Sequence, residues 1–260
     1  MHPFIHELGD NLRSRQVEID NSGVQLADYE SYIENWVHEI KKPLSLMTLV
    51  LDNRKEELSP LVYSRMLHVR DHIRQDVEQI LYFSRLGATH KDYYWEPLSV
   101  LAVCKDAISD NQTLLEEAGF TIDFWGHDCN VFSDKKGLMF ILGQLINNSV
   151  KYADKTASPT LLFQLRENSG EETIVLSITD NGPGIPSSDL PFVFEKGFTG
   201  DRGSYMSRST GMGLYLVKKM ATDLAIDLQI TSELKCGTTV SLIFPKVKSS
   251  VRRCSDAANN

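Results

Sequence analysis

Hydrophobic residues in the first third of the chain recur at alternating steps of four and three. This heptad spacing is typical of a helix that packs against a partner helix through one apolar face. It predicts a helix over residues 27–53, with apolar positions at Ile33, Val37, Ile40, Leu44, Met47 and Leu51. Pro43 lies inside this helix, and its missing amide donor and its ring should bend the axis.

A second segment of the same spacing follows Ser59-Pro60, a typical helix start because Ser caps helices and Pro suits the first helical position. The predicted helix runs to about residue 86, with apolar positions at Val62, Met66, Val69, Ile73, Val77 and Ile80. The two helices can pack as an antiparallel hairpin, but a hairpin buries only one side of each helix. We therefore expect two copies to form a four-helix bundle, which predicts a homodimer.

The pattern then changes to short strands that alternate unevenly with helices. Helices are predicted over 99–118, 135–153 (capped by Ser133 or Asp134) and 212–224, and strands over 120–125, 131–132, 160–166, 173–180, 227–232 and 238–244. This order indicates a mixed sheet with helices on one face. The predicted domains are a leading helix and linker (1–26), the hairpin (27–90), an α/β domain (91–247) and a disordered tail (248–260).

Composition excludes several classes of function. The 260 residues, 42% of them hydrophobic, suffice for two cores. The net charge of −8 argues against nucleic-acid binding. The four cysteines (104, 129, 236 and 254) show no zinc-site spacing and favour a reducing compartment. Since no apolar run is long enough for a membrane span or a signal peptide, we expect the chain to be soluble as given.

His38 is the first candidate for chemistry. It lies one position past the apolar residue Val37, so a helix places its imidazole at the flank of the apolar face, open to solvent. An imidazole is nucleophilic near pH 7, and a carboxylate such as that of Glu39 can take its proton. Taken alone, a histidine in such a place is more often an ordinary surface residue.

Two glycine-rich loops in the C-terminal half suggest a nucleotide. The first runs Asp180-Asn181-Gly182-Pro183-Gly184-Ile185, where the glycines let the backbone approach a planar ligand and the carboxylate suits an amine such as that of adenine. The second, Gly211-Met212-Gly213-Leu214, opens a helix whose free amides suit phosphate. Residues 197–210 between them are predicted to form a mobile lid. Either loop alone is also ordinary turn chemistry.

The helix before these loops carries Gln144, Asn148 and Lys151 on one face. Amide oxygens are hard ligands suited to Mg²⁺, which shares its shell with phosphates and water, and a lysine can hold a phosphate. Each residue alone is more often part of a solvated surface. Together with the two loops, this face indicates a site for ATP.

The set of motifs resembles the cytoplasmic kinase core of bacterial sensor histidine kinases, over residues 27–246. His38-Glu39 with Pro43 resembles the phosphoacceptor box, 144–152 the asparagine box, 180–184 the first glycine box, 192–195 the phenylalanine box, 211–213 the second glycine box, and 237–238 the last strand-turn element. Trp36-Val37-His38 together with Phe-Glu-Lys-Gly-Phe-Thr-Gly at 194–200 is similar to the intramembrane-sensing kinases that respond to peptide antibiotics.

The resemblance implies a multidomain protein in which the all-α dimerisation and phosphotransfer hairpin precedes an α/β sandwich ATP-binding domain of the GHKL type. ATP would phosphorylate His38 with Glu39 as general base, and the phosphoryl group would pass to an Asp of a response regulator receiver domain. Mg²⁺ would be held by Asn148 and Gln144. Nucleotide contacts are implied for Asn148, Lys151, Tyr152, Asp180, Gly182, Gly184, Ile185, Phe194, Gly211, Gly213, Leu214 and Thr238.

The family also implies a setting. The chain would be the cytoplasmic portion of an inner or plasma membrane protein, with a peptide-antibiotic transporter as a partner in the membrane and no nucleic acid. Two positions depart from the family pattern: Lys42 stands where Thr or Asn is usual, and Gln144 where Asn is usual. Because a lysine cannot orient water as an acceptor, we expect weak phosphatase activity toward the regulator.

Two other functions remain open. One is a GHKL-type ATPase clamp, in which ATP closes a dimer without phosphoryl transfer. The other is a degenerate kinase that only docks a regulator, favoured by Lys42 and Gln144. A clamp does not need a hairpin that presents His38, whereas a degenerate kinase does not need Asn148 and Asp180.

Overall fold

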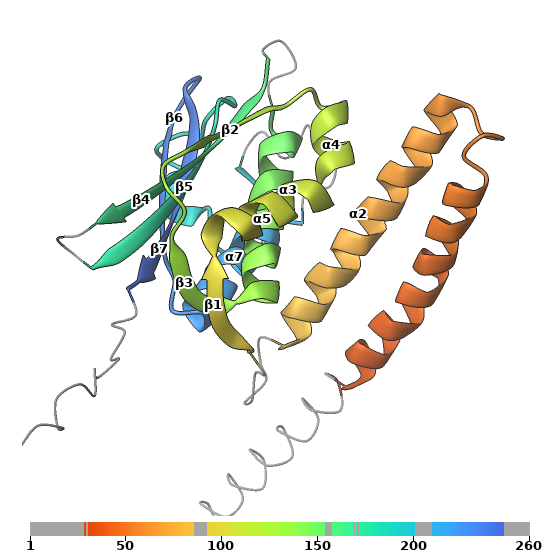
Figure 1. Cartoon of the computed structure of the whole chain (residues 1–260), viewed down its shortest axis with the longest axis horizontal. Coiled ribbons are helices and arrows are strands. Elements are labelled where there is room, and N and C mark those ends of the chain that lie inside the picture. Colours follow the sequence, from red (N-terminus) through yellow and green to blue (C-terminus); the bar gives the residue numbers. More distant parts are fainter. Residues whose placement is uncertain are drawn as a thin grey trace, which may run out of the picture. The chain divides into compact units, whose positions relative to one another are not determined.

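The computed structural model describes residues 29, 31–85, 93–153, 158–168, 170, 172–200 and 210–246, and the chain divides into two compact units, residues 1–92 and 93–260. The predicted leading helix, the tail and most of the predicted lid lie outside the described residues. The described part of the first unit consists of helices, and the described part of the second combines helices with β-sheet (Figure 1).

The first unit contains a helix over residues 31–53 and α2 (Pro60–Arg85), which lie side by side and are joined by a short turn (Figure 1). The helix continues through Pro43 without interruption. The Ser59 hydroxyl accepts a hydrogen bond from the Val62 amide at 3.4 Å, which confirms the predicted start of α2. Val37 and Leu51 are the most buried apolar residues of the first helix, as its heptad pattern predicts.

The sequence predicted that six apolar residues of α2 pack within the hairpin, and this prediction is wrong for most of them. Of Val62, Met66, Val69, Ile73, Val77 and Ile80, only Val77 is buried, at 4% exposure, whereas Val69 is 48% exposed. The half-buried apolar positions are instead Tyr63, Leu67, Leu81 and Tyr82. The helix therefore carries two apolar faces, and spacing alone does not tell which one packs against the first helix.

The second unit is built on a five-stranded sheet in the order β2-β4-β5-β7-β6, in which β2 is parallel to β4 and the other pairs are antiparallel. Its strands are β2 (Thr121–Trp125), β4 (Thr160–Asn168), β5 (Thr173–Asp180), β6 (Asp227–Glu233) and β7 (Gly237–Pro245). The helices α3 (Val100–Asp110), α5 (Lys135–Lys151) and α7 (Gly213–Asp223) gather on one side of the sheet (Figure 1). The predicted mixed sheet with helices on one face is confirmed.

Two local predictions in this unit need correction. The helix predicted over 99–118 is divided into α3 and α4 (Gln112–Glu117), because the Asn111 amide group donates to the Ala107 carbonyl at 2.8 Å and the Asn111 backbone leaves the helical conformation. The pattern also missed β1 (Trp95–Ser99), which contains Pro97 and pairs antiparallel with β3 (Asn130–Asp134) in a separate two-stranded sheet.

The core of the second unit lies between the sheet and α5. Ile141, Leu142 and Ile146 of α5 are fully buried, as are Phe163 of β4 and Leu176 of β5. Asp134 caps the helix by accepting a 2.6 Å hydrogen bond from the Gly137 amide, which decides between the two predicted caps. Burial of one face and this cap hold α5 in place, so the polar residues of its last two turns have a defined position at one end of the sheet.

Candidate functional site

A pocket of about 200 Å³ collects residues from segments that are far apart in the sequence. Seven of the predicted nucleotide-binding residues line it: Asn148, Tyr152, Asp180, Gly184, Ile185, Leu214 and Thr238. Its walls are largely apolar, with Leu145, Ile178, Val193, Phe198, Ile230 and Val240. An apolar cavity with a few convergent polar groups is typical of a small-molecule site.

Asp180 is the most constrained polar group of this pocket. It ends β5 between Leu161 of β4 and Thr238 of β7. Its carboxylate accepts hydrogen bonds from the amides of Gly182 at 2.9 Å and Thr238 at 3.3 Å, and from the Ser149 hydroxyl at 3.4 Å. Burial raises the pKa of Asp180 above its ordinary value, although these hydrogen bonds act in the opposite direction. The carboxylate is therefore fixed in direction and poorly solvated, which suits an acceptor for a ligand amine.

The first glycine loop is held by its neighbours on both sides. Asn181 accepts from the Thr160 amide at 2.8 Å and donates to the Ser158 carbonyl at 2.9 Å. Gly184 has a φ of +70°, and a Cβ there would lie 2.0 Å from the Glu233 carbonyl oxygen. The Ile185 amide donates to the Ser232 hydroxyl at 2.8 Å. The loop is thus pressed against the β6–β7 turn, and glycine is required for that approach.

The second glycine loop lies beside the polar face of α5. A Cβ on Gly213, the first residue of α7, would lie 3.1 Å from Gln144 Oε1 and 3.9 Å from Asn148 Oδ1. The Gly197 amide donates to the Gly211 carbonyl at 3.1 Å, so the two ends of the predicted lid meet. The start of α7, where backbone amides lack helical partners, is therefore placed next to two amide oxygens.

The other predicted residues are not among those that line the pocket. Gly182 is buried against Asp180, and a Cβ there would lie 2.8 Å from Asp180 Oδ1. The Lys151 ammonium lies 5.7 Å from the centre of the Tyr152 ring, and the Lys218 ammonium lies 5.8 Å from that of Phe194. Gln144 is only 6% exposed. Tertiary contacts add Ser149, Asp189, Phe198 and Thr199 to the pocket; of these, the last two fall inside the motif at 194–200.

The candidate Mg²⁺ ligands at this site are two side-chain amides, those of Gln144 and Asn148. No group of three or more His, Cys, Asp or Glu side chains that could hold a metal occurs among the described residues. The oxygens of Gln144 and Asn148 approach the same glycine of α7. Two hard oxygen ligands fit a magnesium ion that takes its remaining ligands from phosphates and water.

His38 and Glu39 are both exposed on the first helix of the first unit, which confirms that the imidazole is open to solvent. Glu39 Oε1 lies 3.9 Å from Lys42 Nζ, and both of these side chains are more than three-quarters exposed. A phosphoryl donor can therefore approach the ring from solvent, next to one carboxylate and one ammonium group.

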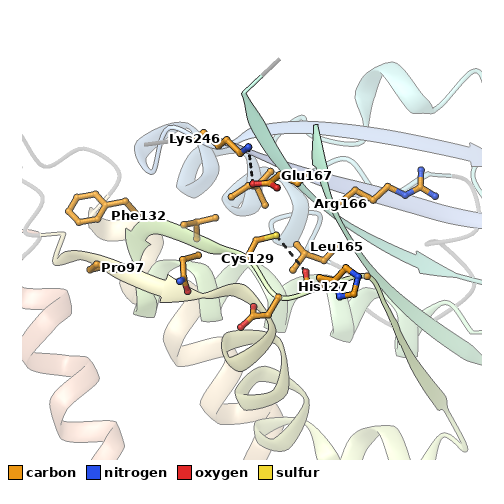
Figure 2. A pocket seen from close by; sticks show the side chains of 13 residues that line it. Pro97, His127, Cys129, Phe132, Leu165, Arg166, Glu167 and Lys246 are labelled. Carbon is orange, nitrogen blue, oxygen red and sulfur yellow. Dashed lines mark hydrogen bonds and ion pairs between the residues drawn. The ribbon is translucent and has the colours of Figure 1, made fainter. Parts of the chain in front are cut away.

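A second and larger pocket, of about 930 Å³, contains none of the predicted site residues. Figure 2 shows it between the surface of β3 that carries Phe132 and the end of β4 that carries Arg166 and Glu167. At its rim Lys246 Nζ lies 2.8 Å from Glu167 Oε1. Burial and the neighbouring Glu167 raise the pKa of the Cys129 thiol. Because this space lacks the convergent motifs, its greater volume does not make it the nucleotide site.

Sequence comparisons decide the family. Residues 133–248 match the family described as "Histidine kinase-, DNA gyrase B-, and HSP90-like ATPase". Over 238 residues the chain is 32% identical to "Sensor histidine kinase GraS" of Staphylococcus aureus. The chain belongs to the sensor histidine kinases. It is also 36% identical over 219 residues to "Sensor protein BceS" of Halalkalibacterium halodurans. The two alignments cover 91% and 84% of this sensor histidine kinase, and 66% and 63% of the relatives, so the chain spans slightly less than two thirds of their length.

Solved structures show the same fold. Full-length ShkA, crystallised in complex with AMPPNP, has a TM-score of 0.61 at 20% identity, over 83% of this chain and 45% of that chain. The Acinetobacter baumannii histidine kinase AdeS has a TM-score of 0.54 at 18% identity, over 80% of this chain and 97% of that chain. These similarities show the fold, and the family match over residues 133–248 shows an ATPase domain of the GHKL type that follows two helices in the sequence. Within the described residues, no helix is both long and apolar enough to span a membrane.

Proposed function

We propose that this chain is the catalytic core of an ATP-dependent protein-histidine kinase in a two-component system. The observation that carries the proposal is the pocket in which Asn148, Asp180 and Thr238 converge from three elements, in a chain that also presents His38 to solvent. The second unit would bind ATP, and His38 would receive its terminal phosphoryl group. An Asp of a response regulator receiver domain would then take the phosphoryl group from His38.

The pocket supports a definite orientation for the nucleotide. Adenine would lie among the apolar walls with its amine toward Asp180, because this half-buried carboxylate is a poorly solvated acceptor held in the pocket. The phosphates would point toward the start of α7, whose free amides and dipole attract anions, and toward Lys151. Asn148 and Gln144 would hold Mg²⁺, which when bound supplies positive charge to the phosphates.

The transfer itself needs few protein groups. An imidazole nitrogen of His38 forms a bond to the γ-phosphorus, the bond to the β,γ-bridging oxygen breaks, and ADP leaves with the electron pair. The proton displaced from the ring goes to Glu39 as general base. Both side chains are solvent-exposed on the first helix, so the rate depends on how ATP is brought to the ring.

A labelling experiment tests this function. Wild type incubated with γ-labelled ATP and magnesium should acquire acid-labile label, and His38→Gln should lose at least about 99% of it because no other residue supplies the nucleophile in the proposed step. His72→Gln, which removes an exposed histidine of α2, should label like wild type.

The alternatives give different results in the same experiment. ATP turnover without label on the protein would favour the ATPase clamp, and the absence of both would favour the docking module. Label that is retained in His38→Gln would contradict the assignment of His38.

We also propose that two copies form a four-helix bundle from their antiparallel hairpins. Large apolar side chains remain exposed on both helices of one copy, namely Leu46, Leu49, Val50, Leu61, Val62, Met66, Val69 and Ile73. Covering them would remove apolar area from water, at roughly 25 cal/mol per Å². A second copy supplies a face with the same spacing, as a two-fold symmetric interface requires.

The double variant Val69→Glu/Ile73→Glu tests the bundle. It should convert a dimer into a monomer, because each copy would place two charges in an apolar interface. Light scattering after gel filtration measures the mass. Arg65→Glu, a charge change on the same helix, should leave the dimer intact. A double variant that remains dimeric would show that this face is not the interface.

The cellular setting follows from the family. We propose that the chain acts as the cytoplasmic portion of a plasma or inner membrane sensor. Its relation to peptide antibiotics and to a transporter in the membrane rests on the motifs at 36–38 and 194–200.

A further inference from the structure

Lys42 lies on the first helix at a position between the two residues assigned to phosphoryl transfer. Successive residues of an α-helix are rotated by about 100°, so Lys42 is about 40° from His38 around the axis and about 60° from Glu39. Its Nζ atom is 3.9 Å from Glu39 Oε1, and the two side chains are 77% and 76% exposed. The ammonium group is thus already directed to the side of the helix that carries both residues.

Lys41 provides a comparison within the same turn. It is also exposed, but it lies about 60° from His38 on the side away from Glu39. Among the described residues, its ammonium group has no ion pair. The two lysines carry the same charge at nearly the same distance along the chain from His38, and only one is placed between His38 and Glu39.

We propose that Lys42 binds the phosphoryl group once it is on His38 and so retains it there. The inference rests on the proposed function of His38. A phosphoryl group brings close to two negative charges and three acceptor oxygens, a stronger partner for an ammonium group than one carboxylate. The exposed pair with Glu39 contributes little net free energy, so Lys42 can exchange partners readily.

This contact should slow hydrolysis of the phosphohistidine. In hydrolysis a water oxygen bonds to phosphorus and the phosphorus–nitrogen bond breaks, with its electron pair returning to the imidazole. One proton of the water ends on the ring nitrogen, and the other leaves with inorganic phosphate. The transition state is loose, and negative charge moves from the phosphoryl oxygens toward the departing nitrogen. An ammonium group on those oxygens therefore stabilises the phosphohistidine more than the transition state, which lowers the rate.

The test loads His38 without ATP. Phosphoramidate phosphorylates imidazoles directly: its phosphorus–nitrogen bond breaks, ammonia leaves, and the new bond forms on the ring. The full chain and its variants are loaded, freed of reagent and held in EDTA, and phosphate release is followed over time. The signal of His38→Gln, which still contains the other histidines, is subtracted. The same variants are also loaded from ATP and magnesium.

We expect Lys42→Gln to shorten the half-life of phosphorylated His38 about threefold to tenfold at low ionic strength. Lys42→Arg should restore most of it, because a guanidinium also binds phosphate, and Lys41→Gln should resemble wild type. The difference should shrink as salt is added. A merely structural role for Lys42 would not give rescue by arginine together with this salt dependence.

Two outcomes overturn the proposal. Equal or longer half-lives in Lys42→Gln would show that Lys42 does not retain the phosphoryl group, and an equal shortening by Lys41→Gln would show only a general effect of charge. The two loading routes separate this question from the proposed function. A chain that accepts phosphoryl from phosphoramidate but not from ATP is not the proposed kinase, yet its half-lives still report on Lys42.

Discussion

Asp180→Asn should weaken ATP binding roughly tenfold to a hundredfold while leaving the second unit at least as stable as wild type near neutral pH. An aspartate has two acceptor oxygens, whereas an asparagine has one oxygen and an NH2 group, which is a donor and cannot accept from the adenine amine. Hydrogen bonds to charged groups contribute about 1.5–3 kcal/mol, so the dissociation constant should rise roughly tenfold to a hundredfold. The asparagine oxygen can still accept from the Gly182 and Thr238 amides, which keeps the loop in place.

The stability half of this prediction follows from the direction of the pKa shift. Burial raises the pKa of Asp180 above its ordinary value of 3.8, so the folded state favours the protonated carboxyl. That contribution to stability is fully present below 3.8 and is lost as the pH rises through the raised pKa. At neutral pH the wild type therefore holds a carboxylate whose ionisation disfavours folding, whereas asparagine does not ionise.

Calorimetric titration with ATP and thermal unfolding between pH 3 and pH 8 measure both effects. The difference in melting temperature between Asp180→Asn and wild type should grow in favour of the variant from acid to neutral pH. Asp123→Asn, at an exposed position of β2, should change neither quantity. Unchanged ATP affinity would show that Asp180 does not contact the nucleotide. A lower melting temperature of the variant at neutral pH would show that ionisation of Asp180 does not disfavour folding.

Gly184→Ala should both destabilise the second unit and remove nucleotide binding. Its φ of +70° is left-handed, which costs a residue with a Cβ about 1–2 kcal/mol. The new Cβ would also lie 2.0 Å from the Glu233 carbonyl oxygen. Since backbone is on both sides of this contact, the loop must move away from the β6–β7 turn, at a further cost of roughly 1–3 kcal/mol.

Gly119→Ala is the matched control. Its φ is +72°, but nothing lies within 4 Å of the added Cβ. The stability of this variant should fall only by the cost of the left-handed backbone conformation, and the variant should bind ATP like wild type. Thermal unfolding and calorimetric titration of both variants compare the two positions directly. Equal losses of stability and of ATP affinity in the two variants would show that the contact between residue 184 and the Glu233 backbone adds no cost of its own.

Local patterns predicted most of the elements because their causes lie within a few residues. The strand predicted over 173–180 is β5 to the residue, since its alternating residues and the flanking turn signals are all local. The helix before the glycine loops begins at Lys135 as expected, because the Asp134 cap is a local hydrogen bond. The helix predicted over 99–118 is interrupted at Asn111, where a side chain competes for a backbone carbonyl.

The failures have a common physical reason. β1 exists because it pairs with β3, whose paired residues lie 31 to 39 positions further along the chain, and a short segment with Pro97 gives no periodic signal of its own. The two apolar faces of α2 have similar spacing, and only packing distinguishes the half-buried Leu67 from the exposed Val69. The sequence likewise named Asp180 and Asn148 but not Ser149 or Asp189, which join the pocket through contacts between elements.

By itself, the sequence determined the resemblance to sensor histidine kinases, the two heptad-patterned helices, the solvent-facing position of His38, and the glycine loops that follow a strand and precede a helix. Those features depend on periodicity, turn chemistry and motif order, all of which are properties of neighbouring residues. Only the tertiary structure decided that Asp180 is half-buried with a raised pKa, that Gly184 touches the Glu233 backbone, and that Gln144 meets the start of α7. Burial and close approach are set by chain segments far apart in sequence, and no local pattern records them.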